Sequence, residues 1–203
     1  MILDEINSLL QIESEAIKNI PINEEFEKAL TIIHEQVHLK KGKLITSGMG
    51  KAGQIGINMA TTFSSTGTPA VFLHPAEAQH GDLGVMQEND VMLLISNSGK
   101  TREILELIDL ARNLRPDIRF IVITGNPDSV LAKAADATLL TGNPQEVCAL
   151  GLTPTTSTTT MTVIGDILVV LLMKKIKFDN HAYSLRHHGG YLGDKSRIAA
   201  RGI

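Results

Sequence analysis

A glycine-rich loop follows the first apolar run of the α/β part of the chain and has the residue types that bind phosphate. The stretch LITSGMGKAG, residues 44–53, contains Gly48-x-Gly50-x-x-Gly53, the pattern of a dinucleotide-binding turn. A dinucleotide site also needs an acidic residue about 20 positions later, at the end of the second strand, to bind the ribose hydroxyls. Leu73-His74-Pro75 stands there instead. We therefore expect a different ligand and no nicotinamide, flavin or other cofactor.

A second loop, SNSGKT at residues 96–101, carries hydroxyl and amide groups where a helix is expected to begin. Its last four residues match the end of a triphosphate-binding loop, but the first glycine of that motif would fall at Leu94. A nucleotide triphosphatase is therefore not expected. Hydroxyls and free N–H groups at a helix N-terminus suit a single phosphate, because the helix dipole favours an anion there. The alternative is a loop that only caps its helix.

The framework that must hold these loops is indicated by alternating apolar runs and amphipathic stretches. Such patterns predict strands at 44–45, 70–73, 91–95, 120–123 and 138–140, and helices at 52–65, 102–115, 129–135 and 155–175, the last being the longest. The alternation predicts an α/β fold, a three-layer doubly wound five-stranded parallel sheet with helices on both faces. Ligands of such sheets bind at the carboxyl ends of the strands, near the switch in strand order. Both loops are expected at that edge.

The first 40 residues have a different pattern. Apolar residues recur at helical spacing from Ile2 to Leu10 and again from Phe26 to Val37, which predicts a pair of amphipathic helices. We divide the chain into an N-terminal helical extension, residues 1–40, and one α/β domain, residues 41–203. Because the pair is too amphipathic to stay exposed, it is expected to pack on the core or at an oligomer interface.

Composition and charge exclude several classes of partner. The net charge is −3, aromatic residues make up 3% and Trp is absent, so the chain lacks both the basic field and the stacking surfaces of nucleic-acid-binding proteins. The single Cys148 excludes an internal disulfide, and no secretory signal opens the chain, which is typical of a cytoplasmic protein. The longest apolar run, residues 163–173, is shorter than the about 20 residues that span a bilayer. We expect a buried helix and no membrane partner.

Six motifs together resemble one known family. In order and at matching spacing, the chain is similar to the sugar-isomerase (SIS) domain of arabinose-5-phosphate isomerases in GMGKAG (48–53), TTFSSTGTPAVFLHPAEAQHGDLG (61–84), SNSGKTREI (96–104), GNP (125–127), GLTPTTSTT (151–159) and HHGGYLG (187–193). The resemblance covers about residues 40–195 and implies a flavodoxin-like SIS fold. It further implies interconversion of D-ribulose 5-phosphate and D-arabinose 5-phosphate, the first step towards Kdo for lipopolysaccharide or capsule. Many members carry two cystathionine-β-synthase-type modules after this domain, and we expect none within these 203 residues.

The resemblance also implies a catalytic set of Lys51, Glu103, Glu146 and His187. Isomerisation needs a base that takes a proton from carbon and a group that stabilises the enediolate. Lys51 is implied to neutralise that charge, the alternative being a solvated surface cation. We expect Glu146 to be the base, because it follows a turn after the fifth strand, where no helix dipole accounts for a carboxylate as it does for Glu103. Glu103 competes for that role, although a carboxylate in the first turn of a helix is favoured without any function. His187 is implied to protonate an oxygen and open the cyclic substrate.

Substrate binding is assigned to small, hydroxyl-bearing and histidine residues at the expected strand ends and helix starts. They are Ser47, Gly48, Gly50, His80, Ser96, Asn97, Ser98, Thr101, Thr156, Ser157, Thr158 and His188. Neutral donors suit a phosphate dianion in an acidic protein that has no basic patch. No metal is required, and His80 is expected to take part in trapping an inhibitory zinc ion.

One motif departs from the family pattern. Arg186-His187-His188-Gly189-Gly190 stands where Ser-His-Pro-Gly-Gly is usual, so the backbone is freer and a cation is added. His188 therefore stays an alternative to His187, and the substrate preference is open. The resemblance also implies a homotetramer in which the C-terminal histidine and a residue of the HGD segment complete the active site of a neighbouring subunit. Two other functions stay open: a non-catalytic sugar-phosphate sensor, and an isomerase of a heptose or hexulose phosphate.

Overall fold

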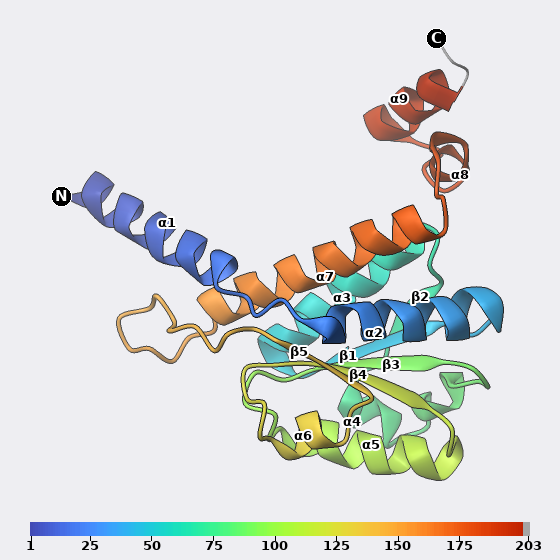
Figure 1. The fold of residues 1–203 in the computed structure, drawn as a ribbon, viewed down its shortest axis with the longest axis horizontal. Coiled ribbons are helices and arrows are strands. Elements are labelled where there is room, and N and C mark those ends of the chain that lie inside the picture. Colours follow the sequence, from blue (N-terminus) through green and yellow to red (C-terminus); the bar gives the residue numbers. More distant parts are fainter. Residues whose placement is uncertain (201–203) are drawn as a thin grey trace.

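The computed structural model describes residues 1–200 of the chain. These residues form nine α-helices and five strands, with two short helices of other types (Figure 1). In chain order they are α1 (Ile2–Lys18), α2 (Glu24–Ile33), η1 (His34–Leu39), β1 (Leu44–Gly48), α3 (Gly50–Ser65), β2 (Ala70–Phe72), α4 (Pro75–Ala78), η2 (Asp82–Val85), β3 (Val91–Ile95), α5 (Arg102–Leu114), β4 (Arg119–Thr124), α6 (Val130–Lys133), β5 (Ala137–Leu140), α7 (Thr156–Lys175), α8 (Asn180–Ser184) and α9 (Gly190–Ala200).

The sheet is parallel throughout and has the strand order β2-β1-β3-β4-β5. Its register pairs Leu44 of β1 with Ala70 of β2 on one side and with Val91 of β3 on the other. The chain therefore leaves β1 towards β2 and returns to the opposite side of β1 as β3. This is the flavodoxin-like order, whose switch point lies between β1 and β3. The predicted α/β fold is confirmed, and α7 is the longest described helix, as expected.

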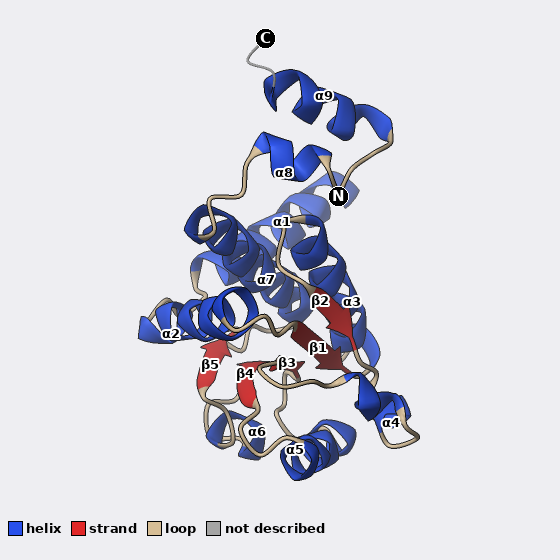
Figure 2. Ribbon diagram, turned by 90° about the vertical axis from the view of Figure 1, so that its right-hand side faces the viewer, coloured by secondary structure: helices blue, strands red, loops and turns tan. Residues whose placement is uncertain are grey.

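Helices cover both faces of the sheet (Figure 2). A layer of apolar side chains lies between the sheet and the helices on each face. Alternate strand residues belong to the two layers: Leu93 of β3 packs with residues of α2, α3 and α7, whereas Leu94 packs with residues of α4, α5 and α6. The three central strands are buried almost throughout, which explains why they appear in the sequence as continuous apolar runs. This rigid sheet fixes the loops that leave its carboxyl edge.

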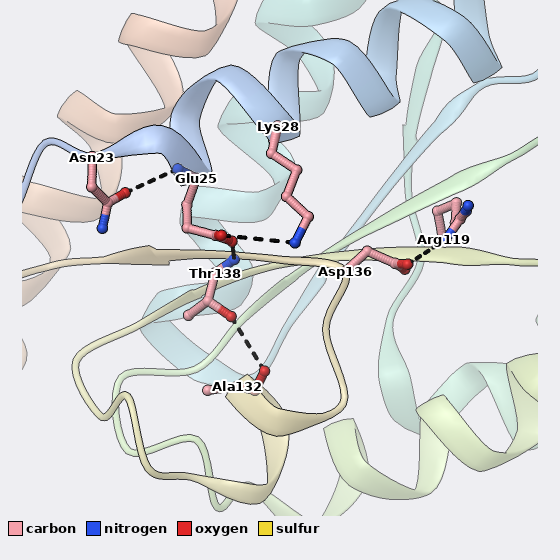
Figure 3. Close-up of polar contacts among 7 residues, drawn as sticks. All are labelled: Asn23, Glu25, Lys28, Arg119, Ala132, Asp136 and Thr138. Atoms are coloured by element: carbon pink, nitrogen blue, oxygen red, sulfur yellow. Dashed lines mark hydrogen bonds and ion pairs between the residues drawn. The ribbon is translucent and has the colours of Figure 1, made fainter.

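Helix α2 is attached to the edge strand β5 by polar contacts (Figure 3). The Asn23 side chain caps the helix by accepting from the Glu25 N–H at 3.1 Å. The Glu25 carboxylate accepts from the backbone N–H of Thr138 in β5 at 2.8 Å and pairs with Lys28. Phe26, Ala29 and Ile33 of α2 are buried in the core. This half of the N-terminal helical pair is therefore an integral part of the domain.

Helix α1 is placed differently. It projects from the core beside the start of α7, and its apolar residues Ile2, Leu3 and Leu10 are 69%, 70% and 63% exposed. Helices α8 and α9 lie beyond the opposite, C-terminal end of α7 (Figure 1). Within this single chain α2 is covered and most of α1 is exposed, so the packing of the whole extension on the core or at an oligomer interface stays a prediction.

Helix α7 is long and apolar enough, by length and composition, to cross a membrane. The 20 residues of α7 reach the length of about 20 residues that spans a bilayer, although its longest apolar run, residues 163–173, does not. One side of α7, including Ile164, Leu168 and Leu172, is buried against the sheet and its helices. The helix therefore has the position of a core helix, as the sequence predicts.

A buried carboxylate fastens the amino edge of the sheet, and its removal is expected to be costly. Asp90 is 2% exposed and accepts from the Lys43 ammonium group at 2.7 Å, from the Lys43 N–H at 2.8 Å and from the Gln87 N–H at 2.7 Å. Asp90→Ala leaves these donors without an acceptor, so the free energy of unfolding should fall by about 3 kcal/mol. Denaturant unfolding checks this, with the exposed Asp117→Ala as control. A loss no greater than that of the control would contradict the structural role.

Candidate active site

A cavity of about 1160 Å³ opens at the carboxyl ends of β1, β3, β4 and β5. Its walls are the loops that follow these strands and the first turns of α7. The two loops singled out in the sequence do meet here, on either side of the switch point. The expected site residues that line the cavity are Lys51, Ser96, Asn97, Ser98, Thr101, Glu146, Ser157 and Thr158.

The SNSGKT loop is tied to the two strands beyond it. The carbonyl of Asn97 accepts from the Gly125 N–H at 2.9 Å and from the Thr124 hydroxyl at 3.1 Å. The Asn97 side-chain oxygen accepts from the Thr141 hydroxyl at 3.3 Å, which leaves the amide nitrogen as the donor group of this side chain. The loop is therefore fixed by the ends of β4 and β5 before any ligand binds.

The turn inside this loop requires glycine. Gly99 has a φ of +63°, and a Cβ there would lie 2.2 Å from the Ser129 hydroxyl oxygen. The Thr101 hydroxyl lies 2.8 Å from that of Ser96 and makes no capping bond to α5. Because this side chain does not cap the helix, the first N–H groups of α5 remain suited to an anion, which favours the phosphate interpretation over simple capping.

Glu146 lines the same cavity and caps α7. One carboxylate oxygen accepts from the Thr155 N–H at 2.7 Å, the Thr155 hydroxyl at 3.0 Å and the Ser157 N–H at 3.3 Å. The other accepts from the Ser157 hydroxyl. Partial burial raises the pKa of the Glu146 carboxyl, but the hydrogen bonds from Ser157 and Thr155 together outweigh it and hold the pKa below its ordinary value. The residue is therefore an anion at neutral pH.

This cap corrects one argument from the sequence. From the sequence, Glu146 is not expected to stabilise a helix end. In the structure its carboxylate accepts from N–H groups at the start of a 20-residue helix. No short-range spacing signals this contact, because Glu146 and Thr155 are nine positions apart along an irregular loop. Glu146 is nevertheless the carboxylate that lines the cavity within the described residues.

Several expected binding residues lie elsewhere. Ser47 is fully buried and donates to the Leu73 carbonyl at 2.6 Å, so its hydroxyl ties β1 to β2. Thr156 is also fully buried, and its hydroxyl donates to Glu13 of α1 at 3.0 Å. Gly48, Gly50, His80 and Glu103 are not among the residues of the cavity wall. Of the two carboxylates that compete for the role of base, Glu103 therefore lies further from the cavity than Glu146.

His187 lies between α8 and α9, far from the cavity of its own chain. Its Nδ1 is 3.0 Å from the Tyr183 carbonyl, which only accepts, so Nδ1 carries the proton and Nε2 is the basic nitrogen. The ring stacks on Tyr183 with centroids 3.7 Å apart. The cavity is at the start of α7 and His187 is past its end, a helix length of about 30 Å at 1.5 Å per residue. His187 and the neighbouring His188 therefore do not reach the cavity of the same chain.

Sequence reasoning missed two ionisable residues of the cavity wall, Lys100 and Cys148. Lys100 stands inside the SNSGKT motif, and its presence there was the available signal. Cys148 is partly exposed, and its sulfur accepts from the N–H groups of Thr153 and Leu152 at 3.1 and 3.2 Å. Hydrogen bonds from Thr153, the backbone one first, lower the pKa of the Cys148 thiol to about 7.

This thiol provides a reporter of cavity occupancy. Because the thiolate is the reactive form, alkylation of Cys148 by iodoacetamide should follow a titration with its midpoint near pH 7, instead of about 8.5 for an unperturbed thiol. A phosphosugar in the cavity should slow the reaction. Mass spectrometry measures the rate, and Cys148→Ser gives the background because the chain has one cysteine. A midpoint near 8.5, or no protection at saturating phosphosugar, would contradict the geometry.

Within residues 1–200, no group of three or more His, Cys, Asp or Glu side chains is arranged to hold a metal ion. His80 is exposed after the short helix α4 and lies outside the cavity wall. The inhibitory zinc ion stays a prediction, and a site for it would need ligands in addition to His80.

The sequence matches a known domain family and known proteins over most of its length. The family described as SIS domain matches residues 39–171. The chain is 48% identical over 189 residues to arabinose 5-phosphate isomerase KdsD of Yersinia pestis, covering 92% of this chain and 56% of that protein. It is 47% identical over 195 residues to KdsD of Francisella tularensis, covering 96% and 58%. The chain thus spans little more than half the length of these curated relatives.

Solved structures share both fold and sequence with the chain. A Bacteroides fragilis protein, a proposed phosphosugar isomerase involved in capsule formation, is 66% identical with a TM-score of 0.93, covering 94% of this chain and 100% of that one. A protein of an E. coli strain, solved in complex with arabinose 5-phosphate, is 33% identical with a TM-score of 0.85, covering 92% and 97%. With its five-stranded parallel sheet and the cavity at the carboxyl edge, the chain belongs to the SIS domain family.

Proposed function

We propose that this protein interconverts D-ribulose 5-phosphate and D-arabinose 5-phosphate through an enediolate. The observation that carries the proposal is the cavity itself, whose wall includes the loops after β1 and β3, suited to a phosphate, together with the Glu146 carboxylate. Further support comes from the curated KdsD relatives and from the 33% identical protein that holds arabinose 5-phosphate. A sensor would need the loops and could use Glu146 as the cap of α7, so turnover of the sugar is what distinguishes the two functions.

The roles of the residues follow from their positions. The phosphate is held by the SNSGKT loop and the N-terminus of α5, since the hydroxyls of Ser157 and Thr158 already donate to Glu146 and to the Thr155 carbonyl. Glu146 takes a proton from C2 of the aldose or from C1 of the ketose, and the protonated carboxyl, which exchanges with solvent, returns a proton to the neighbouring carbon. A second proton moves between the oxygens on C1 and C2 to complete the isomerisation. Lys51 neutralises the charge that develops on the enediolate oxygens. These steps need protein groups alone.

The strongly bonded state of Glu146 shapes its action. A base with a lowered pKa is weak, and its best pKa would be near the working pH. A bound sugar, with its own hydroxyls and its phosphate dianion, must therefore draw Ser157 away from the carboxylate, which frees one oxygen for proton transfer. The Ser157 hydroxyl thus donates to Glu146 in the free protein and to the substrate in the complex.

A homotetramer with shared sites accounts for His187. Because this histidine lies beyond the far end of α7, only a second copy of the chain brings it to a cavity, and its Nε2 is then available to act on a ring oxygen. The exposed apolar stripe of α1 and exposed Leu185, Tyr191 and Leu192 support burial of these elements between subunits.

The place of the reaction in the cell is part of the proposal. Arabinose 5-phosphate from this cytoplasmic enzyme would be condensed to the eight-carbon acid Kdo for lipopolysaccharide or capsule. The involvement in capsule formation of the 66% identical Bacteroides fragilis protein favours capsule. No nucleic acid or membrane is needed by this chemistry.

Turnover assays on the purified protein test the proposal. Chelator-treated protein is supplied with D-ribulose 5-phosphate, a heptulose 7-phosphate or a hexulose 6-phosphate, and products are separated by anion-exchange chromatography. We expect D-arabinose 5-phosphate from the first substrate at a rate at least about a hundredfold above the others. Preference for the seven- or six-carbon sugar would transfer the assignment to that isomerase. Binding without turnover of any sugar would make the protein a sensor.

A further inference from the structure

Helix α1 contributes a carboxylate that contacts the start of α7, next to residues of the cavity wall. Glu13 lies on the side of α1 that faces the start of α7, and one of its oxygens accepts from the Thr156 hydroxyl at 3.0 Å. These two residues are 143 positions apart. Thr156 is fully buried, so its hydroxyl belongs to this contact and not to the cavity. The contact joins the N-terminal extension to the segment that carries Glu146 and its partners.

Thr156 stands in the middle of the segment that Glu146 caps. The residues on either side of it, Thr155 and Ser157, both donate to the Glu146 carboxylate, and Ser157 lines the cavity. Two carboxylates from distant parts of the chain therefore bind three successive residues at one helix start. Glu146 approaches from the cavity, whereas Glu13 approaches from α1.

The second oxygen of Glu13 is buried and has no hydrogen-bond partner among the residues that the structure describes. Buried acceptors are almost always paired, because an unpaired one is unfavourable for folding. Glu13 is also on a helix whose outward apolar side chains are exposed, so burial of α1 within the chain is slight. Packing alone therefore does not explain a carboxylate at this position.

We propose that Glu13 is a positioning residue of the active site, which fixes the first turn of α7 through Thr156 and so sets the Glu146 carboxylate and the Ser157 hydroxyl. The proposal rests on the proposed function for its kinetic consequences. Helix α1 then contributes to the geometry of the active site. It also predicts that a disturbance of α1 reaches the cavity through one hydrogen bond.

Four variants and a control test this assignment. Glu13→Ala and Thr156→Val should each lower kcat/KM about tenfold, because small displacements of a catalytic group are costly. The double variant should lose no more than either single one, because both remove the same contact. Glu13→Gln retains an acceptor oxygen and should keep at least about half of the activity. Glu15→Ala is the control, since Glu15 lies on α1 but, among residues 1–200, its side chain bonds to Gln11 and Lys18 and not to α7.

Three outcomes would overturn the proposal. These are a kcat/KM within about twofold of wild type for Glu13→Ala, a roughly hundredfold loss in the double variant, or a lowered unfolding temperature with unchanged kinetics well below it. Amide hydrogen exchange at residues 156–160 gives a readout independent of activity. It should be faster in Glu13→Ala and in Thr156→Val, but not in Glu15→Ala. If the wild type isomerised no sugar, the proposed function would fall, and unchanged exchange would separately refute the positioning role.

Discussion

Glu146→Gln is expected to lower kcat about a thousandfold, because a positioned proton-transfer group contributes about 10²–10⁴-fold. Glutamine is the sharpest replacement here. Its carbonyl oxygen can still accept from Thr155 and from the Ser157 N–H, and its amide can donate to the Ser157 hydroxyl, so the cap on α7 survives. Affinity for the phosphosugar should stay within about tenfold of wild type. Turnover assays and isothermal calorimetry measure the two quantities.

Two further variants separate catalysis from structure. Glu146→Ala removes the cap as well as the carboxylate, so it should also lower the free energy of unfolding by about 1 kcal/mol. Glu103→Gln addresses the competing base and should leave kcat within a few-fold, since Glu103 is outside the cavity wall. Full activity in Glu146→Gln together with loss in Glu103→Gln would transfer the role of base to Glu103.

His187→Ala is expected to lower kcat about a hundredfold, within the range for one acid–base group. The decisive experiment mixes this variant with Glu146→Gln and allows subunits to exchange. If a cavity takes its histidine from a neighbouring subunit, about one quarter of the sites in a random mixture combine an intact Glu146 with an intact His187. Activity should then rise to about a quarter of the wild-type value.

A site built from one chain gives a different result. Each subunit of the mixture would then contain one defect, and activity would stay at the low sum of the two variants. His188→Ala is the matched control, because His188 neighbours His187 in the same segment. If His188→Ala were the more damaging substitution, the histidine assignment would shift by one residue.

The fold was predictable because its signals are local. Continuous apolar runs such as 91–95 mark strands buried on both faces, and the glycines and hydroxyls after them mark the ligand edge. Gly99 shows why this works: a left-handed φ and a close contact with Ser129 both require glycine, and the requirement is visible in the motif itself.

The organisation of the site was less predictable because its contacts are not local. Nothing in the spacing of Glu146 and Thr155 shows that an irregular loop folds back to cap α7, and nothing joins Glu13 to Thr156 across 143 residues. Sequence motifs also do not reveal distance. His187 belongs to the same motif set as Lys51, yet the length of α7 separates it from the cavity of its own chain.

The most direct test of an enediolate isomerase is an NMR time course in heavy water. Purified, chelator-treated protein is mixed with D-ribulose 5-phosphate, and the anomeric proton of D-arabinose 5-phosphate is followed together with the deuterium content at C2. The account predicts that this signal appears and that C2 carries deuterium, because the base exchanges its proton with solvent. Product whose C2 carries hydrogen transferred from C1, or a substrate that stays unchanged while it protects the protein against heat, would contradict it.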